Sequence, residues 1–369
     1  MKVLGYVMAN NEWPLLGLSI THALEYAVDH VVVVIHNQSN SVRAHLKRLK
    51  ISLKGLITIY ELEGPYFQES TTHISLALTD LKEFDWVYIF DCDEFTIVKS
   101  KKLFHKNLES LSKNIHAVRY NIEQFISPYD FNENNIKDFL KIKFKSVPNI
   151  FYKFDDRILY DELLHENINF FDIPFPSKII FRKNFFENIG PGAHNLDINK
   201  LNECFLKSSI FYVVHLPMIS FDKLKSRSEH GKLLIDQKYP PWYGWQNQLI
   251  YLIDINNGLT NFWKKHSVPE NLQNESVEFT YKIDNIFKIK IQKTIKKYKK
   301  LMTGKIIKNI MPTIMLSDLV RINENYKIEI IGLKNKISNL ENEINSLKSS
   351  RLYSLLLSIR RILYLFLKK

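Results

Sequence analysis

The run HVVVVIH at residues 30–36 constrains the fold of this chain more than any other stretch. Its β-branched residues favour an extended strand, and the lack of polar alternation indicates a strand that is buried on both faces. Strand-like and helix-like patterns alternate around it, at 2–9, 13–28, 30–36, 42–49, 55–62, 68–81 and 86–90. This alternation predicts an α/β fold in which helices cover a parallel sheet and ligands bind at the carboxyl ends of its strands.

Three carboxylates follow the fourth expected strand, in the segment DCDEF. Asp91, Asp93 and Glu94 repel one another unless a cation or a set of hydrogen-bond donors stabilises them. Asp91 and Asp93 are two residues apart and are expected to project to the same side of an extended chain. One of them, Asp93, would then bind a divalent ion, while Asp91 would hold the ion's water or a ribose. A helix cap or a turn is the alternative interpretation of such a pair.

The segment FDCDEF resembles the D-x-D-E-F signature of bacterial glycosyltransferases of the family 2-like group. Other segments within residues 1–235 fit that family in the same order: MANNE, VVVVIHNQSN, GPYFQES, SKIIFRKNFFENIGPGAHNL and FYVVHLPMISFDKLKSRSEHGK. The resemblance implies a GT-A fold, a Rossmann-like mixed sheet flanked by helices. It also implies transfer of a sugar from a nucleotide-diphosphate sugar, preferably a UDP-sugar, to a glycan or glycolipid acceptor of the cell envelope. A divalent metal (Mn2+ or Mg2+) and inversion at the anomeric carbon belong to the same expectation.

The resemblance also implies roles for individual residues. The residues expected to bind the nucleotide-sugar are Asn11, Glu12, Asn37, Ser39, Gln68 and Asp91, and those expected to bind the metal are Asp91, Asp93 and His215. His36 departs from the family, which commonly has an aspartate there. Either Glu123 or Asp197 is a candidate for the catalytic base, and the sequence does not separate them.

Several of these residues also have a simpler structural interpretation. Glu12 precedes Pro14 and suits a helix cap, and histidines at strand ends, such as His194 and His215, are often structural. The basic residues Lys223, Lys225 and Arg227 suit either a phosphate clamp or a solvated helix face. The aromatic segment at 239–248 suits either a sugar-stacking loop or ordinary packing.

The C-terminal quarter carries the basic charge of the chain. Of 51 Lys and Arg residues, 20 lie within 282–369, against 6 of 39 Asp and Glu, so this part has a net charge of +14 and the remainder −2. The lysine-dense segment around 282–311 predicts either a basic amphipathic helix on an anionic membrane surface or a solvated helix. A heptad pattern from Tyr326 to Leu347 predicts a short coiled coil that allows a homo-oligomer, and the end at 350–369 suits a helix in the membrane interface.

These patterns suggest four segments. They are a nucleotide-sugar-binding half at 1–100, an acceptor-binding half at 101–270, a basic linker or helix at 271–315, and a coiled coil with an amphipathic helix at 316–369. Two cysteines are too few for a disulfide framework, and neither a signal peptide nor a stretch apolar enough to span a bilayer is recognisable. We therefore expect a cytoplasmic protein that is peripheral on the inner face of the cytoplasmic membrane.

Three rival functions remain to be weighed. Nucleotidyl transfer also uses acidic pairs after a strand, but it requires a glycine-rich phosphate loop that YVMANNEWP lacks. A non-catalytic coiled-coil scaffold at the membrane would make the acidic cluster a cap. Nucleic acid is not expected as a partner, because the basic tail lacks the aromatic, arginine-rich surface that stacks on bases.

Overall fold

A computed structural model describes residues 1–10, 12–37, 39–63, 68–149, 161–165, 167–239, 244–269, 280–303 and 314–349. The chain divides into two compact units, Met1–Leu316 and Ser317–Lys369. The expected interfacial helix at 350–369 lies outside the described residues.

Four parallel strands form one half of the sheet in the first unit. They are β1 (Val3–Ala9), β2 (His30–His36), β3 (Ile57–Leu62) and β4 (Trp86–Ile89), in the spatial order β3-β2-β1-β4. The valine run occupies β2, between β1 and β3, and its valines are fully buried. The expected strand and helix alternation is thus confirmed in the first hundred residues.

The other half of the sheet is mostly antiparallel. It contains β8 (Lys178–Arg182), β6 (Ala117–Ile126), β7 (Phe144–Ser146) and β11 (Tyr281–Ile283), while β12 (Ile314–Met315) extends the edge at β3. Three further strands branch from this path: β5 (Glu94–Val98), β9 (Glu203–Phe205) and β10 (Phe211–His215). β8 runs antiparallel to both β4 and β6. The prediction of a mixed sheet flanked by helices is confirmed.

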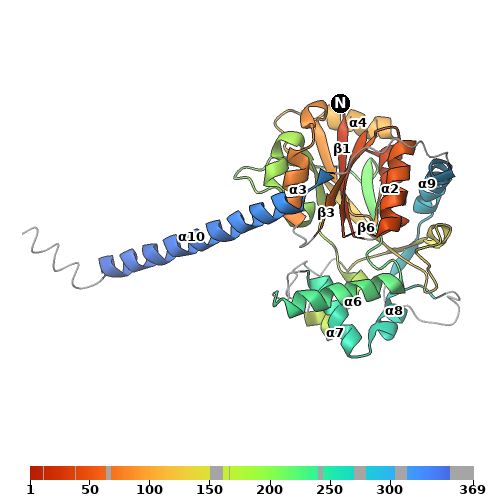
Figure 1. Ribbon diagram of the computed structural model, residues 1–369. Helices are drawn as coiled ribbons and strands as arrows, with labels where there is room; N and C mark the ends of the chain where they lie inside the picture. The colour runs from red at the N-terminus through yellow and green to blue at the C-terminus, as the bar shows by residue number, and fades with distance from the viewer. Residues whose placement is uncertain are drawn as a thin grey trace, which may run out of the picture. The chain divides into compact units, whose positions relative to one another are not determined.

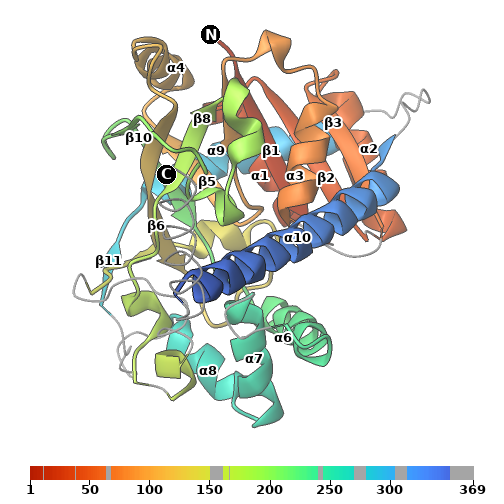
Figure 2. The same cartoon turned by 90° about the vertical axis from the view of Figure 1, so that its left-hand side faces the viewer.

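Helices pack on both faces of this sheet. α1 (Leu15–Tyr26), α2 (Asn40–Ser52) and α9 (Ile286–Thr303) lie on one side, and α3 (Gln68–Ala77) lies on the other (Figures 1 and 2). α4 (Lys101–Glu109) begins at the N-cap Ser100, whose side chain accepts a hydrogen bond from Leu103 N–H.

The described part of the lysine-dense segment contains α9, and the apolar face of this helix packs into the main core. Phe287, Ile291, Ile295 and Tyr298 are at most 5% exposed and join the core that includes α1. Burial of this face stabilises the fold, so these side chains are not available for insertion into a bilayer. Most of its lysines are exposed on the outer face, whereas Lys290 donates a 2.7 Å hydrogen bond to the Val98 carbonyl.

A second, smaller core lies beneath α6 (Phe221–Asp236), α7 (Trp245–Ile255) and α8 (Leu259–His266), below the sheet in Figure 1. Trp245, Leu249 and Trp263 belong to it. α6 and α7 approach closely at Gly231, where an added Cβ would lie 2.0 Å from the carbonyl oxygen of Asn247. Glycine is therefore required there by space, and this contact sets the distance between the two helices.

The second unit contains α10 (Ser317–Ser349), a helix of 33 residues. Helix formation over 326–347 agrees with the heptad pattern. None of the helices within the described ranges is both long enough and apolar enough to cross a bilayer.

Candidate active site

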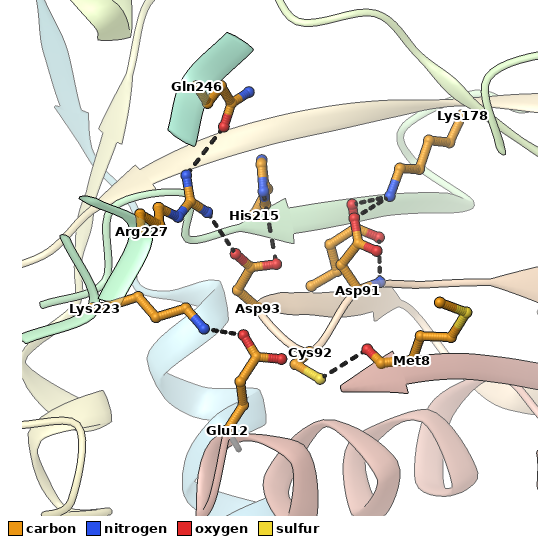
Figure 3. Close-up of polar contacts among 11 residues, drawn as sticks. Met8, Glu12, Asp91, Cys92, Asp93, Lys178, His215, Lys223, Arg227 and Gln246 are labelled. Carbon is orange, nitrogen blue, oxygen red and sulfur yellow. Dashed lines mark hydrogen bonds and ion pairs between the residues drawn. The ribbon is translucent and has the colours of Figure 1, made fainter. Parts of the chain in front are cut away.

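The acidic turn between β4 and β5 lies at the carboxyl end of the parallel strands, where a ligand site was expected. Phe90 N–H still donates to Tyr6 of β1 (3.0 Å), and the chain then turns, with Glu94 N–H donating to the Asp91 carbonyl (3.1 Å). Asp91 and Asp93 thus belong to a turn and not to a continuous strand, and they lie close enough for the charge of Asp91 to act on Asp93. Each of the two carboxylates pairs with a different cation (Figure 3).

Asp91 and Glu94 share the ammonium of Lys178, the first residue of β8. Lys178 Nζ lies 2.6 Å from Asp91 Oδ2 and 2.7 Å from Glu94 Oε1. The side chains of Lys178 and Glu94 are 5% and 1% exposed, whereas that of Asp91 is half exposed. Glu94 also accepts the Asp91 N–H at 3.2 Å. The buried Glu94 therefore stabilises the turn from the protein interior, and the exposed part of Asp91 is accessible to a ligand.

Asp93 faces His215 and Arg227. Its carboxylate oxygens lie 3.7 Å from His215 Nε2 and 3.8 Å from Arg227 Nη2, beyond hydrogen-bond length but within ion-pair distance. His215 ends β10, which pairs with β5 so that His215 is opposite Glu94. The Leu216 N–H donates to the Asp93 carbonyl at 3.0 Å. These backbone contacts hold the aspartate and the histidine next to each other.

Two residues one turn apart on α6 supply positive charge to the same place. Lys223 forms an ion pair with Glu12, which follows β1, and Arg227 donates a 3.0 Å hydrogen bond to Gln246 Oε1 on α7. Lys225 lies instead over the ring of Phe221, 4.8 Å from its centroid. The spacing of four residues puts Lys223 and Arg227 on one helix face. Figure 3 shows both pointing toward the acidic turn.

The pKa values in this cluster depend on burial and on neighbouring charges. Burial, together with the charge of Asp91, raises the pKa of Asp93 to about 7. Burial also lowers the pKa of His215 to about 4, so its imidazole is neutral at pH 7. Partial loss of water around the Asp91 carboxylate opposes its ionisation, but the charge of Lys178 outweighs this effect and lowers the pKa of Asp91. Asp91 is therefore ionised at pH 7, whereas the ionisation of Asp93, with a pKa of about 7, depends on the charges around it.

Asp93 and His215 have the donor chemistry of a divalent-ion site. A neutral imidazole and a carboxylate are both metal ligands, and Mg2+ or Mn2+ is commonly held by one or two protein groups plus phosphate oxygens and water. Within the described ranges, no three His, Cys, Asp or Glu residues are grouped so that they could hold an ion. An ion at this pair would therefore need oxygens from a bound ligand. Asp91 is a less suitable ligand than expected, because Lys178 already supplies its counter-charge.

His194, the other strand-end histidine considered from the sequence, has a structural contact. His194 Nδ1 lies 3.1 Å from the Ser177 carbonyl oxygen, and the Arg119 guanidinium donates to the His194 carbonyl at 2.9 Å. Of the two histidines considered from the sequence, His215 is the one that the fold brings to Asp93.

The residues expected to bind the nucleotide-sugar are described only in part. Glu12 is in the cluster, whereas Asn11 and the side chain of Gln68 lie outside what is described. Ser39 caps α2, accepting the Val42 N–H at 3.4 Å. Asn37 follows β2 with a positive φ of 46°, and its side-chain amide lies 3.1 Å from His36 Nε2. Both therefore lie directly after the carboxyl end of β2.

Of the two candidates for the catalytic base, Glu123 points away from His215. Glu123 pairs with Val214 across β6 and β10, and His215 is the next residue, so the Glu123 side chain points to the opposite face from His215. Its carboxylate forms a 2.7 Å ion pair with Lys145. Asp197 is exposed, and its N–H donates to the Asn188 carbonyl at 2.7 Å.

Two site residues were not singled out from the sequence. Lys178 opens the apolar strand KIIFR, and a lysine entering a buried strand is a signal for a buried partner. Gln246 lies within the aromatic segment 239–248 and is the second residue of α7, where no local pattern distinguishes it from a solvent-exposed residue.

No known family profile matches the chain, and no curated protein matches it. Among solved structures it is similar to S. aureus TarS 1-349 (11% identity, 68% of this chain and 70% of that chain, TM-score 0.35). It is also similar to TarS 1-349 in complex with UDP-GlcNAc, with 15% identity over 71% of this chain and 73% of that chain and a TM-score of 0.31. A third similar structure is glucosyl-3-phosphoglycerate synthase from Mycobacterium tuberculosis in complex with Mn2+, UDP and glucosyl-3-phosphoglycerate. Its sequence identity is 13%, the match covers 65% of this chain and 81% of that chain, and the TM-score is 0.32. These similarities are too remote to decide what this chain does.

Proposed function

We propose that this protein is a glycosyltransferase that moves a sugar from a nucleotide-diphosphate sugar, preferably a UDP-sugar, to a glycan or glycolipid acceptor. The observation that carries the proposal is the meeting of Asp93 and His215 with Lys223 and Arg227 at the carboxyl edge of the sheet. Departure of a nucleoside diphosphate leaves two phosphates with developing charge, which an enzyme must neutralise. A carboxylate–imidazole pair beside two basic side chains is suited to that task.

In this proposal Asp93 and His215 hold a divalent ion, Mn2+ or Mg2+, which supplies positive charge to the diphosphate when bound. Lys223 and Arg227 bind the phosphates directly, since the guanidinium of Arg227 lies at Asp93 and the ammonium of Lys223 lies beside it at Glu12. Asp91 is ionised and half exposed, so it accepts hydrogen bonds from a ribose or sugar hydroxyl. The remaining contacts to the nucleotide-sugar would come from Glu12, Asn11, Asn37, Ser39 and Gln68. Inversion is the expected stereochemical outcome, by the resemblance to the family 2-like group.

The test is turnover of a panel of UDP-, GDP-, CMP- and dTDP-sugars by the full chain, with and without Mn2+. We expect metal-dependent release of UDP from one UDP-sugar, and a drop of about 100-fold or more in Asp93→Asn. Asp236→Asn, an exposed aspartate at the end of α6, is the matched control and should retain activity. Release of pyrophosphate would instead indicate nucleotidyl transfer. Equal activity of Asp93→Asn and wild type would contradict the role of Asp93, and no turnover of any sugar in the panel would leave the scaffold interpretation.

The basic face of α9 supports a second part of the proposal, association with an anionic membrane surface. Lys288, Lys293, Lys296, Lys299 and Lys300 are exposed on this helix, while its apolar face is buried. Attraction would then be electrostatic, at about 1 kcal/mol for each lysine near the surface. Vesicles with and without anionic lipid, at low and high salt, test this part. Equal binding to neutral and anionic vesicles would contradict it.

A further inference from the structure

The apolar seam of α10 is exposed to solvent. With heptad positions lettered a to g, Ile330 and Ile337 occupy a, and Leu333 and Leu340 occupy d. These four side chains are between 51% and 56% exposed. The sequence continues the pattern with Ile344 at a and Leu347 at d. A helix of this length with an uncovered a/d seam gains stability by pairing with another helix.

The residues beside the seam indicate which partner fits. In a parallel, in-register pair, each g residue faces the e residue five positions later on the other helix. Glu329 at g would face Lys334 of a second copy, and Lys336 at g would face Glu341 of that copy. The sequence repeats the complementarity with Glu343 and Lys348. Each of these three pairs joins opposite charges, although the charge of the g residue alternates between negative and positive along the helix.

The antiparallel arrangement lacks this match. When two antiparallel copies overlap over the whole seam, g faces g and e faces e near the centre. Lys336 then meets Lys336 of the second copy, and Lys334 meets Lys334. Like charges at these positions are unfavourable.

The choice of core residues points to two strands. Isoleucine at a with leucine at d favours a parallel dimer over trimers and tetramers. Asn323 falls at the preceding a position of α10. An asparagine at one a position specifies the register and the dimeric state, because its amide is satisfied only by the matching amide across the seam.

We propose that α10 pairs with α10 of a second copy as a parallel, in-register, two-stranded coiled coil. This inference does not depend on the reaction that the first unit catalyses. It would join two copies of the first unit through their α10 helices.

Charge exchange in the full chain tests both orientation and register. One variant reverses g (Glu329→Lys with Lys336→Glu), and the other reverses e (Lys334→Glu with Glu341→Lys). Each alone places like charges opposite each other, and sedimentation equilibrium should show self-association weakened about tenfold or more. Mixed together, the two variants face each other with opposite charges, and a heterodimer of wild-type affinity should form. Wild-type-like dimers of each variant alone, or no recovery on mixing, would overturn the proposal.

A pair of isoleucines provides the control for the seam. Ile330→Lys puts a charge at a, whereas Ile328→Lys puts it at f, on a residue that is 66% exposed and off the seam. Light scattering on the full chain should show a monomer for Ile330→Lys and a dimer for Ile328→Lys. A wild-type chain that is monomeric or trimeric over the same range of concentrations would refute the two-stranded coil directly.

Discussion

Lys178 lies 2.6 Å from Asp91, although the two residues are 87 positions apart in the chain. Its ammonium also lies 2.7 Å from the buried Glu94. The acidic turn that follows β4 is therefore stabilised in part by a cation that the protein itself supplies. Asp93 instead faces Arg227 of α6 and His215, and this division of roles leads to the following predictions.

Replacing Lys178 should lower the free energy of unfolding more than replacing a surface lysine does. Lys178→Met leaves Glu94 buried without its counter-charge, and we expect a loss of about 3 to 5 kcal/mol in the free energy of unfolding. Urea denaturation measures it, with exposed Lys200→Met as the control. Adding Glu94→Gln to Lys178→Met should recover much of the loss, because the unpaired charge is removed. A double variant no more stable than Lys178→Met would refute this account.

Arg227 should matter for turnover far more than its neighbour Lys225. Removing one preorganised charge at a leaving diphosphate typically costs about 100-fold in rate, so Arg227→Met should lower kcat/KM by about that factor. Lys225→Met is the matched control on the same helix, since its ammonium lies over Phe221. Sugar-transfer assays at saturating metal provide the comparison. Similar activities for the two variants would argue against a phosphate-binding role of Arg227.

His22 predicts a pH dependence of stability. It is buried, with Nε2 2.7 Å from the Thr96 carbonyl oxygen and Nδ1 2.8 Å from Thr294 Oγ1, so it links α1 to β5 and α9. Burial lowers its pKa to about 4, while the unfolded chain has an ordinary histidine pKa of about 6.5. The unfolded state therefore binds more protons between these values, and stability falls as pH falls through that window.

The contribution of His22 is the difference between wild type and His22→Gln. We expect wild type to lose about 2 kcal/mol more than the variant between pH 7 and pH 5. Denaturation at each pH measures it, and the exposed His165→Gln is the control, which should follow the wild-type curve. Parallel curves for His22→Gln and wild type would mean that His22 does not titrate in this way.

Gly231 should be intolerant of a side chain. An alanine Cβ would lie 2.0 Å from Asn247 O, so α6 and α7 must separate, at a cost of about 1 to 3 kcal/mol. The shift should also weaken the contact of Arg227 with Gln246 and lower turnover. Thermal unfolding and activity are the measurements. The control is Gly332→Ala on α10, where nothing lies within 4 Å of the added carbon, and unfolding of the first unit should not change.

The linear sequence was sufficient for the elements of the first hundred residues and for the helix of the second unit. Val31 to Ile35 could only be a buried strand, and the heptads of 326–347 only a helix, because periodicity is a property of neighbouring residues. The position of the acidic turn at the edge of the sheet followed from the same alternation. The lysines of α9 were recognisable too, but not the burial of its isoleucines.

Contacts across the fold decided the chemistry of the turn. Strand register turned Glu123 away toward Lys145 and brought Lys178 to Asp91, and the docking of α6 brought Arg227 to Asp93. These pairs join residues far apart in the chain, and no local pattern records which of many lysines and arginines a carboxylate will meet. Pairing of charges depends on register and on helix packing, which the burial of distant apolar side chains determines.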